Sequence, residues 1–332
     1  MKDFPRDKIK DLLRPGYYFC KDIVDFKGRK RLKKNIILKD LYLGKRAFLL
    51  LTGASLQQID INKLIDEYTF GAGFIFLRED IRNVNLTFYV DLSPSSNFYP
   101  SNPNWPRSYL GVLGKQGILP FYRAIDERFE NRTKLILHSD NYKCIEINNL
   151  FKDKIKYFVK SKKKLHVVEG VSYKAIADLT RRSISGGGSV FFSVLIMMYM
   201  GFKEIYLCGA GYTYEPIYLF HFYDNFVFPK SMGREKAEIE ARKAIDVRNK
   251  KMGTTLEYHG VFEKDNFYAG IYISRMAYDP HKDKHRDLNN YARSQGVKIY
   301  NIVPDGFESP IYEKIPWKEV ESKILRGNPD NI

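Results

Sequence analysis

Several features that would place this 332-residue chain in a familiar class are missing from its sequence. Its three cysteines, Cys20, Cys144 and Cys208, stand far apart without a C-x-x-C pair, which argues against a disulfide framework and a cysteine zinc site. The longest apolar stretch, residues 190–200, is shorter than the roughly 20 residues that span a bilayer. The first residues lack the apolar core of a secretory signal. We therefore expect a soluble protein of a reducing, cytoplasmic compartment.

Three nucleotide-binding signatures are also missing. The sequence contains neither G-x-x-x-x-G-K-[ST] nor G-x-G-x-x-G, which disfavours ATP hydrolysis by a P-loop and a Rossmann dinucleotide site. It contains no D-x-D, so an acidic metal clamp for a sugar diphosphate is not visible. We therefore expect neither a metal nor a cofactor.

The charge balance is strongly basic and uneven. Lys and Arg number 55 against 39 Asp and Glu, a net charge of +16, while 44% apolar residues provide enough material for a core. Residues 1–46 hold fifteen Lys or Arg and six Asp, a net charge of +9. This basic leader is open to three interpretations: a solvated face, a contact with an anionic membrane surface, or a contact with nucleic acid. No nucleic-acid-binding motif accompanies the charge, so we expect no nucleic-acid partner.

The apolar pattern alternates between short strands and helices, which predicts one α/β domain with a mostly parallel sheet and helices on both faces. The proline-rich stretch 93–106 predicts a long loop. The charged helix 234–251 is too polar for a core and predicts a lid or a contact in a homo-oligomer. We expect a basic extension (1–44), a catalytic domain (45–310) with a lid at about 210–275, and a tail (311–332). Strands are expected at 47–52, 70–77, 86–91, 134–138, 157–160, 204–208 and 297–303, and helices at 56–65, 189–200, 234–251 and 287–294.

Two glycine-containing corners are candidates for binding an anion. In a parallel sheet the ligand lies outside the carboxyl ends of the strands, so the loops that follow these ends should converge. Gly53-Ala54-Ser55 follows the first strand and offers backbone N–H groups and a hydroxyl, although a plain tight turn fits equally well. Ser185, Gly186 and Gly187 open the buried helix and would let a ligand approach the backbone closely.

Tyrosines and histidines near the predicted strand ends are candidates for the chemistry. Tyr212 and Tyr214 follow the strand at 204–208, and their phenols can donate to a departing phosphate, although packing is the alternative. His221 has a neighbouring carboxylate, and His281 and His285 stand just before the last helix. Histidine suits the role of a general base because its unperturbed pKa lies near neutrality, and a solvated charged loop is the alternative for the last two.

Three segments, in order, carry a family resemblance. The first segment, residues 45–60, contains the first expected strand and the loop Thr-Gly-Ala-Ser-Leu. The second, residues 185–209, begins with Ser-Gly and ends with Met-Gly-Phe-Lys-Glu-Ile-Tyr-Leu-Cys-Gly. The third, residues 296–304, has the sequence Gly-Val-Lys-Ile-Tyr-Asn-Ile-Val-Pro. Together they resemble the bacterial lipooligosaccharide-type sialyltransferases and the related MptE-like, 6-hydroxymethylpterin pyrophosphokinase-like domains. The resemblance implies a Rossmann-like glycosyltransferase fold of type A variant. It also implies metal-independent transfer of a sialic-acid- or Kdo-like sugar from a CMP-sugar donor to a glycan or glycolipid acceptor, in lipopolysaccharide or other surface-polysaccharide biosynthesis.

The resemblance also implies roles for individual residues. Tyr212 and Tyr214 would stabilise the leaving phosphate, and His281 would be the base, with His285 and His221 as alternatives. Thr52, Gly73 and Asp91 stand where the family has asparagine. The implied nucleotide-binding residues are Thr52, Gly53, Ser55, Gly73, Asp91, Ser185, Gly186 and Gly187.

Two other functions remain open on the sequence. An MptE-like enzyme would transfer diphosphate from ATP to a pterin alcohol and would require magnesium. The interpretation as a non-catalytic nucleic-acid-binding protein is supported by the basic charge alone. In the glycosyltransferase interpretation, the basic leader would hold the protein peripherally on the inner membrane face.

Overall fold

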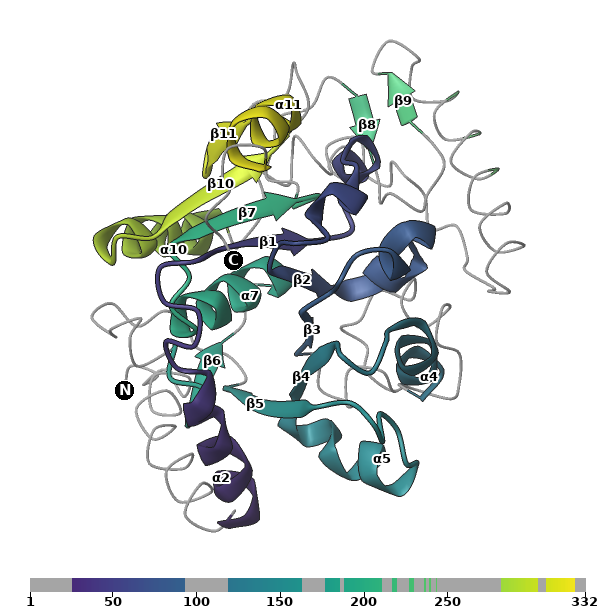
Figure 1. Ribbon diagram of the computed structural model, residues 1–332, viewed down its shortest axis with the longest axis vertical. Helices are drawn as coiled ribbons and strands as arrows, with labels where there is room; N and C mark the ends of the chain where they lie inside the picture. Colours follow the sequence, from purple (N-terminus) through teal and green to yellow (C-terminus); the bar gives the residue numbers. More distant parts are fainter. Residues whose placement is uncertain are drawn as a thin grey trace, which may run out of the picture.

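The computed structural model describes residues 26–92, 119–162, 177–185, 188–210, 217–219, 227–229, 282–303 and 309–325, together with residues 236, 239 and 243. Within these residues nine strands form one sheet in the order β11-β10-β7-β1-β2-β3-β4-β5-β6, and every neighbouring pair is parallel (Figure 1). This arrangement confirms the predicted α/β class. The strands are β1 (Arg46–Leu50), β2 (Thr69–Ala72), β3 (Phe88–Asp91), β4 (Lys134–His138), β5 (Lys156–Lys162), β6 (Arg182–Ser185), β7 (Glu204–Cys208), β10 (Lys298–Ile302) and β11 (Glu313–Ile315).

Strand β1 lies in the middle of the sheet because its sequence is apolar on both faces. After Arg46, its residues Ala47, Phe48, Leu49 and Leu50 have no exposed surface. A parallel strand that is covered on both faces needs such a continuous apolar run. Its neighbours are β2 on one side and β7 on the other.

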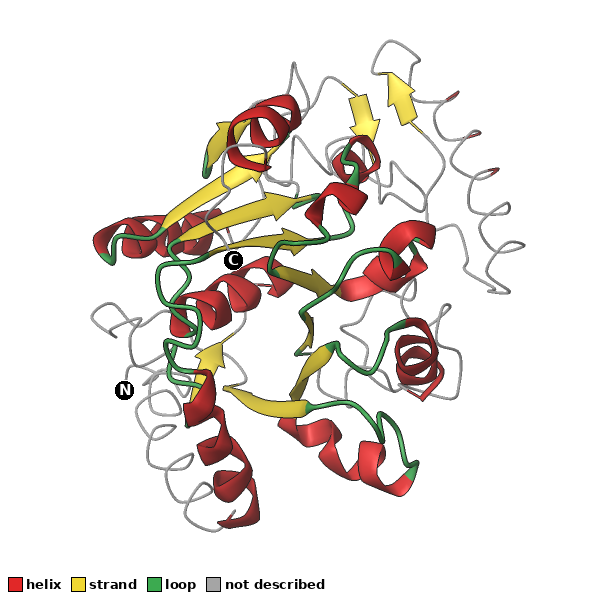
Figure 2. Ribbon diagram, viewed as in Figure 1, coloured by secondary structure: helices red, strands yellow, loops and turns green. Residues whose placement is uncertain are grey.

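Two apolar cores cover the two faces of the sheet, and Figure 2 shows helices on both sides of it. One face packs against α7 (Gly188–Tyr199), α10 (Lys282–Ser294) and the 3₁₀ helix η1 (Lys34–Leu38). The other face packs against the 3₁₀ helices η2 (Ala54–Gln58), η3 (Ile61–Leu64) and η4 (Gly73–Leu77) and the helices α4 (Leu119–Arg128) and α5 (Tyr142–Ile147). Helices on both faces are what the sequence predicts for this fold.

The buried helix α7 fixes which loops meet at one edge of the sheet. Its carboxyl end lies at the amino edge of β1, because Tyr199 and Met200 accept hydrogen bonds from the amides of Asp40 and Tyr42. Twelve helical residues span about 18 Å, which is close to the roughly 16 Å of a five-residue strand. The first turn of α7 at Gly188 therefore emerges at the carboxyl edge of the sheet.

Two predicted elements are wrong in type. The strand expected at 70–77 ends at Ala72, because Gly73 adopts a left-handed φ of +63° and the chain turns into η4. The helix expected at 56–65 is divided into η2 and η3. Between them Asp60 is extended and its carboxylate accepts a hydrogen bond from the amide of Asn62, which starts η3 as a separate turn. Helix α10 begins at Lys282, five residues before the expected start.

Both ends of the described chain pack on the sheet. The basic extension contains α2 (Phe26–Lys33), and in η1 the buried amide of Asn35 donates to the carbonyls of Phe158 and Leu179, each at 2.8 Å. The expected tail supplies β11, α11 (Trp317–Glu319) and the helical segment η10 (Val320–Leu325). The described residues of the extension and of the tail therefore pack on the same sheet as the rest of the described chain.

The expected lid is described only in part. Its described elements are β8 (Ile217–Leu219) and β9 (Val227–Pro229), which form an antiparallel pair. Most of the charged helix at 234–251 and the whole of the loop at 93–106 lie outside the described residues. Among the helices that are described, none is long and apolar enough to cross a bilayer.

Candidate active site at the carboxyl edge of the sheet

The loops after β1 and β7 join at a contact between two glycines. The ladder between these strands continues past their ends, since the amide of Leu51 donates to Cys208 O and the amide of Gly53 donates to Gly209 O, both at 2.8 Å. A Cβ on Gly53 would stand 2.5 Å from the Gly209 carbonyl oxygen, and a Cβ on Gly209 would stand 3.0 Å from Cβ of Leu56. The corner therefore exists only because both positions lack a side chain.

This contact changes which donors the first corner can offer. The expectation that Gly53 presents its N–H to a ligand is not met, because that N–H is bonded to Gly209. The carbonyl of Gly53 accepts from the amide of Leu56. Among the described residues neither the amide nor the hydroxyl of Ser55, at the start of η2, has a hydrogen-bond partner outside η2, so this loop can offer both to an anion.

The ends of β1 and β2 lie side by side at this edge. A Cβ on Gly73 would be 3.5 Å from Cγ2 of Thr52, so these two candidate residues are neighbours. The carbonyl of Gly73 accepts a hydrogen bond from the Tyr89 hydroxyl at 2.6 Å, which fixes the turn that follows β2. The structure thus brings Thr52, Gly53, Ser55 and Gly73 together at this edge.

Asp91 ends the next strand and belongs to a buried polar cluster. Its carboxylate accepts from the Tyr122 hydroxyl at 3.0 Å, and Asn141 donates to the same hydroxyl at 2.5 Å. Burial, followed by the nearby Asp91 charge, raises the pKa of Tyr122 well above its usual value, so the phenol stays protonated and donates to Asp91. This cluster fixes the end of β3, and the sequence analysis did not identify Tyr122 or Asn141.

A small pocket lies beside Ser55. It has a volume of about 140 Å³, too small for a whole nucleotide sugar and large enough for one part of it. Ser55, Gln58 and Lys318 are its polar lining residues, and Trp317 is its aromatic one. The lining residues are Ser55, Gln58, Ile59, Ile302, Val303, Pro316, Trp317 and Lys318.

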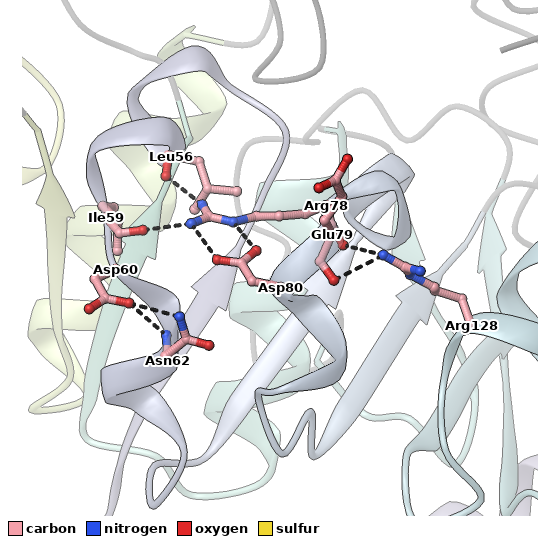
Figure 3. A network of polar contacts seen from close by, with 8 residues as sticks. All are labelled: Leu56, Ile59, Asp60, Asn62, Arg78, Glu79, Asp80 and Arg128. Atoms are coloured by element: carbon pink, nitrogen blue, oxygen red, sulfur yellow. Dashed lines mark hydrogen bonds and ion pairs between the residues drawn. The ribbon is translucent and has the colours of Figure 1, made fainter. Parts of the chain in front are cut away.

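Arg78 holds the loop after β1 in position (Figure 3). Its guanidinium donates to the carbonyls of Leu56 at 2.5 Å and Ile59 at 2.8 Å, and it forms two hydrogen bonds to the Asp80 carboxylate. One planar cation thereby binds two carbonyls at the end of η2, of which that of Leu56 also accepts from the amide of Ile59. No sequence motif indicates this role, because Arg78 is 22 residues from Leu56 and the two residues come into contact only in the folded chain.

His285 is the one candidate base that the described residues include. Its ring has no exposed surface, its Nδ1 lies 2.5 Å from the Tyr312 hydroxyl, and its edge faces the Phe191 ring with centroids 5.9 Å apart. Phe191 belongs to the first turn of α7, so the starts of α7 and α10 are adjacent. His285 joins these two helices and presents no surface to a substrate.

The remaining candidates are only partly located. Ser185 is the last residue of β6, at the far end of the sheet from β11, and Gly188 has a left-handed φ of +81° with open space around it. Gly186, Gly187, Tyr212, Tyr214, His221 and His281 lie outside the described residues. Among the residues that are described, no three His, Cys, Asp or Glu side chains are grouped as metal ligands would be.

Comparisons with known proteins give a distant similarity to solved structures. No protein-family model and no curated protein matches the chain. A structure of the sialyltransferase CstII from Campylobacter jejuni in complex with the substrate analogue CMP-3FNeuAc is 12% identical, covers 82% of this chain and 86% of its own, and gives a TM-score of 0.34. A structure of the same enzyme with cytidine-5'-monophosphate is also 12% identical. The match covers 70% of this chain and 83% of that structure, with a TM-score of 0.28. These values mark a distant similarity, which assigns no role to any residue of this chain.

Replacing Gly53 with alanine should disrupt the corner. Its φ of −64° suits any residue, so the whole effect comes from the clash with Gly209 O. We expect a loss of about 3 kcal/mol in the free energy of unfolding, measured by urea denaturation.

Gly44→Ala is the matched control, because Gly44 has a φ of +80° and no atom within 4 Å of the added Cβ. Its cost should be the left-handed strain alone, about 1 kcal/mol. Equal losses in the two variants would show that the Gly53–Gly209 contact does not constrain the fold.

Proposed function

We propose that the protein is a metal-independent glycosyltransferase that moves a sialic-acid- or Kdo-like sugar from a CMP-activated donor to a hydroxyl of a glycan acceptor. The observation that carries the proposal is the convergence at the carboxyl edge. The Gly53–Gly209 corner, the Thr52–Gly73 pair and the first turn of α7 all emerge there. In open α/β sheets, ligands bind outside the carboxyl ends of the strands, which is this edge.

The donor nucleotide is assigned to the loop after β1. Ser55 supplies an amide and a hydroxyl for the phosphate, and the pocket bounded by Trp317 and Lys318 takes one part of the nucleotide. An indole ring offers a flat apolar face to a base, and a lysine offers an ammonium to a phosphate. The Ser185–Gly187 corner is assigned to the same nucleotide, from its place immediately before α7.

The reaction is a displacement at the anomeric carbon. The acceptor oxygen forms a new bond to that carbon, while the bond from the carbon to the phosphate oxygen breaks and CMP leaves with both electrons. His281 takes the proton of the acceptor hydroxyl, and Tyr212 and Tyr214 donate hydrogen bonds to the departing phosphate. His281 immediately precedes α10, whose start contacts the first turn of α7 through His285 and Phe191, and this supports its place beside the donor.

A screen of nucleotides tests the donor assignment. We expect CMP to raise the melting temperature of the protein, and UDP, GDP and ATP to leave it unchanged, because a ligand at 100 times its Kd stabilises by about 2.7 kcal/mol. Stabilisation by ATP with magnesium, and not by CMP, would favour the pyrophosphokinase alternative and contradict the proposal.

Substitution of each histidine tests the base. General base catalysis contributes about 10²- to 10⁴-fold, so His281→Ala should lower kcat by that factor and leave the Kd for CMP unchanged. His285→Ala should lower the melting temperature, since it removes a buried partner of Tyr312. The assignment would be refuted if kcat changed by less than about threefold in each of the three single variants, His281→Ala, His285→Ala and His221→Ala.

The basic extension is proposed to hold the protein on an anionic membrane surface. Ile36, Ile37, Leu41 and Leu43 are each at least half exposed, and the exposed lysines Lys33, Lys34 and Lys39 lie among them in the sequence. Apolar side chains that insert between lipids, with lysines at the headgroups, fit an interfacial anchor.

Leu41→Ser with Leu43→Ser should reduce co-sedimentation with vesicles that contain anionic lipid, because two inserting side chains are lost. The control is Ile147→Ser, which removes another exposed apolar side chain from α5. Unchanged sedimentation of the double variant would contradict the anchor.

A further inference from the structure

A second pocket lies at the opposite, amino edge of the sheet, and the proposed function does not use it. It has a volume of about 870 Å³ and opens where β1, β2, β3 and β4 begin, with Lys45, Arg46, Tyr68, Thr87 and Lys134 in its lining. Sites for drug-sized ligands occupy about 300–1,000 Å³. The space is therefore large enough for a ligand of nucleotide size.

The lining carries more positive than negative charge. Four cationic side chains, Lys45, Arg46, Arg132 and Lys134, face two acidic ones, Asp66 and Glu67. Arg46 and Glu67 neutralise each other through two hydrogen bonds of 2.9 and 2.5 Å, and both side chains are largely buried. The hydrogen bonds that Arg46 donates to the Glu67 carboxylate raise the pKa of Arg46, so it keeps its charge and stays paired with Glu67.

Two lysines in the pocket are left without an acidic partner. Within the described residues no carboxylate lies within 4 Å of the Lys45 or the Lys134 ammonium, whereas Arg132 has Glu130 at 2.7 Å. The Lys134 ammonium contacts the Tyr42 hydroxyl at 3.4 Å and stands 5.3 Å over the Phe88 ring. One long hydrogen bond and one aromatic face leave most of the donor capacity of Lys134 for another partner.

Two phenols complete the donor set. The rings of Tyr42 and Tyr68 are in contact, with centroids 4.6 Å apart, and both line the pocket. Burial raises the pKa of Tyr42, which keeps its hydroxyl protonated. That hydroxyl accepts from Lys134, so its own O–H can donate to a ligand.

We propose that this amino-edge pocket binds a phosphate-bearing ligand, whose phosphate lies between Lys45, Lys134 and the Tyr42 hydroxyl. Ammonium and phenol donors around a cavity of this size match a phosphate group, which accepts several charge-assisted hydrogen bonds at once. The site is separate from the proposed donor site, because β1 to β4 run from one to the other. The phosphate can belong to a soluble molecule or to a lipid headgroup beside the exposed Leu43.

Calorimetric titration of inorganic pyrophosphate into the full chain tests the site. Lys45→Gln with Lys134→Gln should weaken binding about tenfold or more, because two charge-assisted contacts are lost. The matched control removes two exposed lysines elsewhere, Lys143→Gln with Lys314→Gln, and should stay within about twofold of the wild type. Equal weakening in both double variants, or no binding to the wild type, would overturn the proposal.

Asp66→Asn supplies a change in the opposite direction. Asp66 is an exposed acidic residue of the lining, so its neutralisation should tighten pyrophosphate binding by about two- to threefold. Loss of folding cannot produce tighter binding. No change, or weaker binding, in this variant would count against a phosphate in the pocket.

A vesicle co-sedimentation experiment distinguishes a lipid headgroup from a soluble molecule as the source of the phosphate. If the ligand is a lipid headgroup, Lys45→Gln with Lys134→Gln should also reduce co-sedimentation with phosphatidic acid vesicles relative to the control pair. If the ligand is soluble, only pyrophosphate binding should fall. Stabilisation by CMP should be the same in both double variants, so failure of CMP to stabilise the wild type would count against the proposed function alone.

Discussion

The proposed site depends on one close approach of backbone to backbone. Gly53 and Gly209 touch through a hydrogen bond of 2.8 Å, and neither position has room for a Cβ. This contact extends the pairing of β1 and β7 to the very edge of the sheet. It also places Ser55 beside the ends of β7 and β10. Arg78 then holds the loop from the other side, through the carbonyls of Leu56 and Ile59.

Much of the fold could be predicted because buried parallel strands and one buried helix have strong apolar signatures. The strands 134–138 and 204–208 agree with β4 and β7 residue for residue, and α7 lies within one residue of its expected ends. The errors occur where local backbone conformation prevails over apolar pattern. Gly73 ends β2 although the apolar run continues, and Asp60 divides an apparent helix.

The site was less predictable, because its supports are distant in sequence. The loop after the first expected strand gave Gly53 and Ser55, whereas Thr52, Gly73 and Asp91 came from the family resemblance. The buried partners of Asp91 and the carbonyl contacts of Arg78 have no sequence signal. The sequence does not distinguish a tyrosine or an arginine that packs in the core from one that forms a specific hydrogen bond. The amino-edge pocket was also missed, because lysines at strand starts resemble an ordinary solvated edge. The two edges of one sheet thus present two separate candidate sites, at opposite ends of β1.

The claim that the carboxyl edge binds the nucleotide is tested most directly by a structure of the protein with CMP. The account predicts that the phosphate lies against the amide and hydroxyl of Ser55, with the rest of the nucleotide between the Gly53–Gly209 corner and the first turn of α7. CMP bound at the amino edge, beside Lys45 and Lys134, would contradict it.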